Sequence, residues 1–216
     1  MKSVFDLGRA ARLSGLSVLG LLAMSGSALA HHPTGGRTPA NFAEGLLSGF
    51  GHPIIGIDHF AFMVAIGLLV IGQRHRLLIP AGFVLMTIVG TVVHLMGLDL
   101  FSVEAMVALS VLAAGALLMA NRRYRAGSLV ALGAVAGLFH GYAYGESIVG
   151  AENTPLFAYL AGFSIIQLCV AMAATWIGAK VIDAANSATV TRLSRAAGAA
   201  VCSVGVVYFG LAMQAA

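Results

Sequence analysis

Six long apolar runs between Phe42 and Met213 limit what this chain can fold into. Each run is long enough to cross about 30 Å of hydrocarbon as a helix. Short polar connections separate the runs, which cover residues 42–71, 77–96, 103–120, 127–144, 155–182 and 193–213. Only 9% of the residues are charged, whereas a soluble domain carries about 25%. The sequence therefore predicts an all-α integral membrane protein, with a bundle of six transmembrane helices in a lipid bilayer over residues 42–216.

The basic residues predict the orientation of this bundle. Eight of them lie in or beside three alternate connections: Arg74, Arg76, Arg122, Arg123, Arg125, Lys180, Arg192 and Arg195. The other two connections, around Asp99 and from Glu146 to Thr154, carry none. Because Lys and Arg concentrate in cytoplasmic loops, both ends of the bundle are predicted to lie outside the cytoplasm. The net charge of +4 follows from this topology and does not indicate a nucleic-acid partner.

The N-terminus has the pattern of a bacterial secretory signal peptide over residues 1–30. A basic segment precedes a short apolar segment, and Ala28-Leu29-Ala30 forms a small-x-small cleavage site. Cleavage there predicts a protein of the bacterial inner membrane with its mature N-terminus on the periplasmic side; an uncleaved first helix is the alternative. Residues 31–41 then form a short exposed segment. Its His31 and His32 either capture a metal ion or belong to a polar leader that binds nothing.

The first apolar run contains two histidines and an aspartate, His52, Asp58 and His59. An ionisable group costs about 2.5–3.5 kcal/mol at the centre of a membrane helix, so it usually marks an ion or substrate path. A helix N-terminal region with a buried, hydrogen-bonded histidine is the structural alternative. Pro53 cannot donate a backbone hydrogen bond. We therefore predict that the run splits into a short piece ending at Phe50 and a longer helix that begins at Ile54.

In the predicted orientation, further imidazole and carboxylate groups lie in the outer half of the bundle. They are His94 in the second run, Glu104 in the third, and His140 and Glu146 at the end of the fourth. Imidazole and carboxylate together suit a divalent transition metal. We therefore predict a metal site made from His52, Asp58, His59, His140, Glu146 and His94. Tyr144, Gln167 and Glu104 are candidates for the pathway, with an interhelical hydrogen bond as the alternative for Gln167 and a favourable helix N-terminal charge for Glu104.

Four glycines recur at every fourth position of the fourth run: Gly133, Gly137, Gly141 and Gly145. Such a series allows another helix to approach closely. His140 and Tyr144 flank the series, four residues apart on one helix face. We predict that the helix packed here is the first span, so that His140 meets Asp58 and His59.

Three segments of the chain resemble the HupE/UreJ family of nickel/cobalt permeases. The segment HPIIGIDHFAFMVAIGL carries the family's H-x5-D-H motif at His52, Asp58 and His59. The segment FSVEAMVALSVLAAG resembles the third span, with Glu104 and Ser110 at matching positions, and GLFHGYAYGESI resembles the fourth-span motif at His140, Gly141, Gly145 and Glu146. Where the family commonly has a second histidine, this chain has Tyr144, whose neutral phenol is a poor ligand for a borderline metal. The resemblance covers about residues 42–176 and implies uptake of nickel or cobalt.

The resulting hypothesis is a permease, not an enzyme, that imports Ni²⁺ or Co²⁺; Zn²⁺, Cu²⁺ and Fe²⁺ remain open as cargo, and no tightly bound cofactor is expected. The sequence has no G-x4-G-K-[ST] segment for nucleotide binding. The chain is therefore a passive or ion-coupled carrier, or a subunit that acts with separate transporter subunits; a homo-oligomer is a further alternative. A membrane metal-sensing or accessory protein and an intramembrane metalloenzyme are the competing functions. A metalloenzyme is expected to carry two closely spaced metal-binding histidines, as in H-E-x-x-H, and the sequence lacks this motif.

Overall fold

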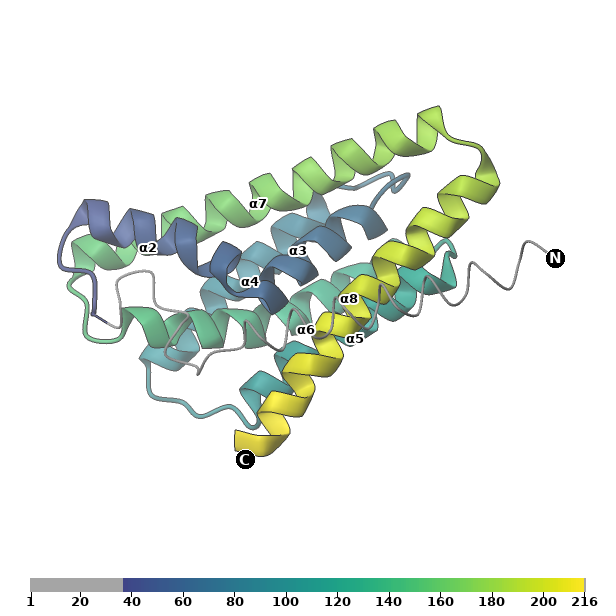
Figure 1. Ribbon diagram of the computed structural model, residues 1–216. Coiled ribbons are helices and arrows are strands. Elements are labelled where there is room, and N and C mark those ends of the chain that lie inside the picture. Colours follow the sequence, from purple (N-terminus) through teal and green to yellow (C-terminus); the bar gives the residue numbers. More distant parts are fainter. Residues whose placement is uncertain (1–36, 216) are drawn as a thin grey trace.

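A computed structural model describes residues 37–215 of the 216-residue chain. Its elements are helices α2 (Phe42–Ile55), α3 (Ile57–Leu69), α4 (Leu78–Leu95), α5 (Val103–Ala120), α6 (Ala126–Gly145), α7 (Asn153–Ala184) and α8 (Ser187–Ala215), with the short 3-10 helix η2 (Glu146–Ile148) (Figure 1). No strand occurs among these described residues, so the predicted all-α class is confirmed for them. The predicted signal peptide lies outside the described residues, as do His31 and His32.

Five of these helices, from α4 to α8, are long and apolar enough to cross a membrane, and α6 continues into η2 over Ala126–Ile148. They correspond to the second to sixth runs predicted from the sequence, and α5 has the predicted bounds. Helices α2 and α3 pass the same test only as a pair, and they are bent by 77° at the break between them. The chain thus has the helices of a multi-pass membrane protein: residues 37–215 contain five that are able to span a membrane, or six if the bent pair is one span.

The break in the first run lies at Gly56, so the predicted break at Pro53 is wrong. Helix α2 continues through Pro53 to Ile55. Gly56 then leaves the helical region with φ −69° and ψ 99°, and α3 begins at Ile57. Tertiary packing explains how α2 tolerates the proline: Gly45 and Gly49 bring the backbone of α2 directly against the backbone of α7. A helix supported in this way can lose one internal hydrogen bond and still continue.

Helices α2 and α3 follow α7 in the same direction. Gly45 and Gly49 of α2 lie against Pro155 and Tyr159 of α7, and Gly67 of α3 lies against Ala171 further along. The hydroxyl of Thr175 on α7 also donates a hydrogen bond of 2.7 Å to the carbonyl oxygen of Gly67. The bent pair therefore begins beside the start of α7 and ends beside its far half, although the chain changes direction sharply at Gly56.

The glycine series of α6 packs against α4, so the predicted contact of these glycines with the first span is wrong. Added Cβ atoms at Gly137 and Gly141 would collide with the backbone carbonyls of Phe83 and Thr87 on α4. From the other side, a Cβ at Gly90 would collide with the carbonyl of Leu138. Because three glycines face this interface, the two helices touch along their backbones, and His140 lies on a different face of α6, towards α3.

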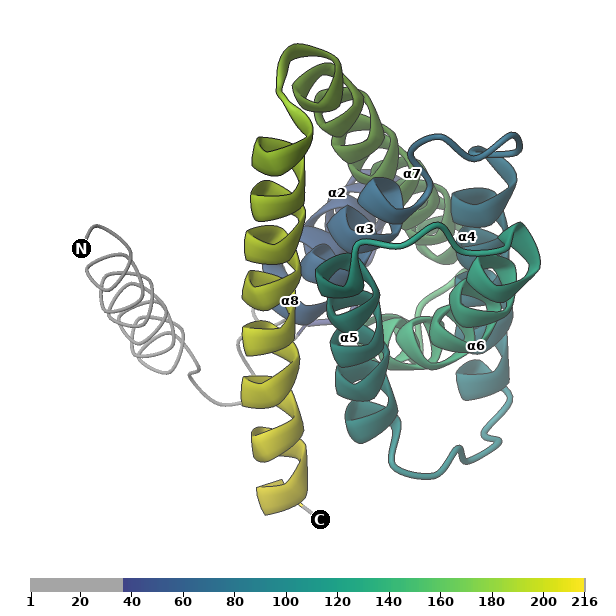
Figure 2. The same cartoon turned by 90° about the vertical axis from the view of Figure 1, so that its right-hand side faces the viewer.

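Helices α5 and α8 form a further closely packed pair, and Figure 2 shows them side by side. Gly115 of α5 faces Gly198 and Cys202 of α8, and a Cβ at Gly205 would lie 2.9 Å from the backbone nitrogen of Leu112. Helix α3 runs between the α4–α6 pair and the α5–α8 pair and carries buried apolar residues such as Phe62 and Ile66, which have no exposed surface. The other helices thus surround α3, which is the second half of the first apolar run.

Candidate metal site

His59 of α3 and His140 of α6 form a direct hydrogen bond inside the bundle. Their Nδ1 atoms are 2.8 Å apart and their ring centroids 4.8 Å apart. Both side chains are buried, with His140 completely so. The aromatic rings of Phe62 and Phe83 lie 4.9 and 5.6 Å from the His140 ring. The predicted meeting of His140 with the first span is therefore present, in apolar surroundings where an imidazole needs hydrogen-bond partners.

Ser110 of α5 contacts the second ring nitrogen of His140. The Ser110 hydroxyl donates its hydrogen to the carbonyl of Val107 at 2.7 Å, and its oxygen lies 2.9 Å from Nε2 of His140. When the hydroxyl hydrogen points at Val107, the hydroxyl oxygen accepts from a protonated Nε2. Neutral His140 then accepts at Nδ1, and His59 donates its Nδ1 hydrogen there. In this arrangement the unprotonated nitrogen of a neutral His59 is Nε2.

His52 of α2 lies on the other side of His59, with ring centroids 5.8 Å apart. Its Nδ1 is 2.6 Å from the hydroxyl of Ser147 in η2. Tyr144 of α6 stands beside both rings, at 4.6 Å from His59 and 5.2 Å from His52 between centroids. The Tyr144 hydroxyl is buried and has no hydrogen-bond partner within residues 37–215. We call His52, His59, His140 and Tyr144 the imidazole cluster.

The spacing of His52 and His59 suits a shared ion. Two imidazoles that bind one ion through nitrogens at about 2.0–2.1 Å have ring centroids roughly 5–6.4 Å apart, and 5.8 Å lies in this range. Because Nδ1 of each ring is hydrogen bonded, coordination by these rings would use Nε2. The described part of the chain holds no group of three or more His, Cys, Asp or Glu side chains arranged to bind a metal ion. The cluster thus offers two imidazoles, and any further ligands would be water or require movement.

The break between α2 and α3 positions this cluster. A Cβ at Gly56 would lie 2.5 Å from Cδ2 of His59, so only glycine lets the His59 ring fold back over the break. Asp58 is buried in the first turn of α3, and its Oδ1 accepts a hydrogen bond of 2.9 Å from the backbone nitrogen of His59. A carboxylate at this end of a helix is favoured by the helix dipole. Asp58 therefore adds negative charge close to the cluster.

The structure places the other predicted residues at different points of the bundle. His94 packs on Tyr142 at 4.5 Å between ring centroids, and its Nδ1 has no hydrogen-bond partner among the described residues. Glu146 is exposed at the start of η2, directly before Ser147. Gln167 is buried between α7 and α4, where it donates 2.9 and 3.4 Å hydrogen bonds to the carbonyl of Phe163 and the hydroxyl of Thr87. Gln167 thus joins α7 to α4.

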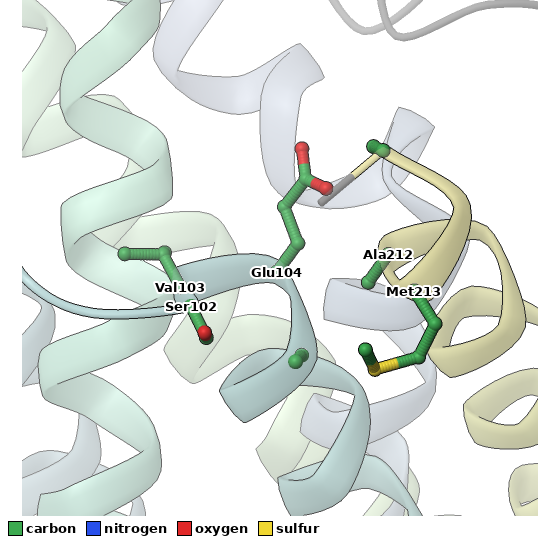
Figure 3. A pocket seen from close by; sticks show the side chains of 7 residues that line it. Ser102, Val103, Glu104, Ala212 and Met213 are labelled. Carbon is green, nitrogen blue, oxygen red and sulfur yellow. The ribbon is translucent and has the colours of Figure 1, made fainter.

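Glu104 lies away from the imidazole cluster, in a hollow of about 330 Å³ where α5 begins and α8 ends. Figure 3 shows its exposed side chain between Ser102 and Val103 on one side and Ala212 and Met213 on the other. Its position in the first turn of α5 fits the favourable interaction of a carboxylate with a helix N-terminus.

Two serines complete the site, and the sequence singled out neither as a ligand or pathway residue. Ser110 stands in the third-span segment quoted above, but its partner is thirty residues away in the chain. Ser147 is separated from His52 by 95 positions. No local pattern marks such long-range partners. The sequence feature that comes closest to indicating Ser147 is the adjacent Glu146, because it places a polar residue at this helix end.

Comparisons with known proteins show which family the chain resembles. The sequence profile of a family described as "HupE / UreJ protein" matches residues 19–208. A curated relative named "Protein HupE", from Rhizobium leguminosarum bv. viciae, is 31% identical over 123 residues. The aligned part covers 56% of this chain and 63% of the relative, so it spans less than two thirds of that protein. No solved structure matches the chain.

Proposed function

The chain belongs to the HupE/UreJ family, and from this membership we propose that it is a membrane permease that imports a divalent transition metal, nickel or cobalt. One observation carries the proposal: three buried imidazoles from three helices meet at a break inside apolar segments. Ionisable groups are rare within membrane segments and usually mark ion paths. Imidazole is also a preferred ligand of nickel, copper and zinc.

In this proposal the bent pair α2–α3 is one span, which gives six spans with the mature N-terminus on the periplasmic side of the inner membrane. His31 and His32 would collect metal there, and Glu146 and His94 would lie at the entrance. His52 and His59 then bind the ion through Nε2 and replace part of its water shell. Asp58 supplies compensating charge. The ion is cargo, so each contact has to be strong enough to admit it and weak enough to release it.

His140 has a supporting role in this mechanism. Both of its ring nitrogens are hydrogen bonded, to His59 and Ser110, so binding an ion directly would break one of these bonds. A second group that holds the far nitrogen of a metal-binding histidine fixes the ring orientation and the tautomer. We therefore assign His140 as the group that orients His59, and Ser110 as the group that sets the tautomer of His140.

Replacing Ser110 by alanine is expected to raise the metal concentration needed for half-maximal uptake by about 10- to 100-fold, the usual effect of removing such a supporting group. Ser110→Thr keeps the hydroxyl and should restore most of the affinity. Ser203→Ala is the matched control, because that hydroxyl bonds at 3.0 Å to the carbonyl of Ala199 in its own helix. Equal uptake curves for Ser110→Ala and the wild type would contradict the assigned role of Ser110.

The proposed function is tested by metal flux. Proteoliposomes containing the purified chain should accumulate radioactive nickel or cobalt above protein-free liposomes, and the unlabelled metals nickel, cobalt, zinc, copper and iron compete in order of preference. The preferred metal is expected to reduce uptake most at equal concentration. Binding without flux would instead indicate a metal-sensing or accessory protein. A metal-dependent reaction without flux would indicate an intramembrane metalloenzyme.

A further inference from the structure

An apolar groove of about 840 Å³ lies on the bundle, away from the imidazole cluster. Helices α7 and α8 form its two walls, and α3 and α5 form its floor. Its lining is dominated by aliphatic side chains, including Val64, Leu117, Val170, Ile177 and Leu193. Ile177 and Leu193 remain 55% and 47% exposed, so the apolar surface of the groove is only partly covered by the chain itself.

The course of α7 and α8 explains why the groove stays open. The two helices are joined by the short connection Ala185–Asn186 and then diverge, as Figures 1 and 2 both show. Helix α8 packs on α5 through Gly198 and Gly205. Helix α7 packs on the bent pair through Gly162, which lies against the backbone of α2. Because α7 and α8 pack on different helices, they diverge. The side chains that line the groove do not fill the space between them.

Two arginines stand at one end of this groove. Arg122 and Arg123 follow the last turn of α5, line the groove and are exposed. Within the described residues, Asp183 is the only acidic residue after Glu152, whereas basic residues gather at this end of the bundle. This end of the bundle is therefore positively charged. The groove combines an apolar lining with two cationic side chains at one end.

We propose that this groove binds an anionic glycerophospholipid, with an acyl chain between α7 and α8 and the phosphate on Arg122 and Arg123. Arginine pairs phosphate oxygens through two parallel hydrogen bonds, which suits it to such headgroups. Basic pockets between membrane helices on the cytoplasmic side are known to bind acidic lipid headgroups. A second copy of the chain fits less well, because two copies meeting symmetrically at this groove would bring their arginine pairs together.

The proposal is tested on the purified full-length chain by native mass spectrometry. Phosphatidylglycerol and phosphatidylcholine with identical acyl chains are offered in equal amounts. We expect the wild type to retain phosphatidylglycerol about 10- to 30-fold more strongly, the preference expected from two arginines near the headgroup. Arg122→Gln with Arg123→Gln should remove this preference. Arg74→Gln with Arg76→Gln is the matched control, because those arginines lie in the loop after α3 and do not line the groove.

A second pair of variants tests the acyl chain without altering charge. Ala173 lines the groove, so Ala173→Trp should fill it and reduce retained lipid of both kinds several-fold. Ala161→Trp places the same side chain at an exposed position of α7 outside the groove, and should change nothing. Equal retention of the two lipids by the wild type would overturn the proposal. So would a dimer of the chain that dissociates in Ala173→Trp. Neither measurement uses metal, so the outcome is independent of the proposed transport.

Discussion

Metal uptake is expected to fall to the level of protein-free liposomes when His59 is replaced by alanine. His59 lies at the centre of the imidazole cluster, with its ring centroid 5.8 Å from that of His52 and 4.8 Å from that of His140. Removing it leaves one imidazole for the ion and separates His140 from the site. Loss of a supporting group alone usually reduces metal affinity by about 10- to 100-fold, so loss of the ligand should reduce uptake by at least about 100-fold. Initial rates at subsaturating nickel or cobalt measure this.

Two controls separate loss of the ligand from loss of the fold. His59→Ala also leaves Nδ1 of His140 without its partner, which costs about 1–3 kcal/mol for a buried group. The amount of folded protein is therefore measured by size-exclusion chromatography before each assay. His75→Ala is the matched histidine control, because His75 is exposed in the loop between α3 and α4. Uptake by a folded His59→Ala variant at the wild-type rate would show that the ion does not pass through the imidazole cluster.

The second large effect is expected from a single methyl group at Gly141. A Cβ there would collide with the carbonyl and Cα of Thr87, at the point where α6 touches the backbone of α4. No flexible side chain can move aside, so the helices must separate, and the neighbouring His140 would shift with α6. Overpacking of this kind costs about 1–3 kcal/mol, which for a chain of this size lowers Tm by roughly 2–12 °C. Thermal unfolding in detergent, followed by circular dichroism, measures the change.

Gly127→Ala is the control on the same helix, because a Cβ at Gly127 meets no atom within 4 Å. It should leave Tm unchanged or raise it slightly, since alanine favours a helix more than glycine does. Gly90→Ala tests the same interface from α4 and should match the loss seen for Gly141→Ala. If Gly141→Ala were as stable as Gly127→Ala, the close approach of α4 and α6 would be wrong.

The sequence predicted those features that depend on local pattern. Five helices match five apolar runs, because the length and hydropathy of a span are properties of one segment. The contact of His140 with the first span was also predicted, although the reason given for it was wrong. The glycine series packs on α4, while His140 reaches α3 from another face of α6. A four-residue repeat shows that some helix approaches closely, but not which one.

Tertiary contacts decided the remaining features. Pro53 is a strong local signal for a helix break, yet α2 passes through it because α7 supports that helix, and the break falls at Gly56. Ser110 and Ser147 became part of the site through contacts across 30 and 95 residues. Glu104 and His94 share a membrane depth with the cluster in the sequence-based interpretation. The structure places Glu104 where α5 begins and α8 ends, and packs His94 against Gly145 at the end of α6, because depth does not fix the rotational position of a residue around a helix.

The bend at Gly56 connects the distance between two imidazoles to the angle between two helices. On an unbroken helix, seven residues would separate His52 and His59 by about 10.5 Å along the axis. With the 77° bend, their ring centroids are 5.8 Å apart. An ion held by both rings would favour this angle over a straighter one, because straightening moves the rings beyond reach of a shared ion. Occupancy and helix angle are then reciprocally linked: the ion stabilises the bend by the same free energy with which the bend strengthens ion binding.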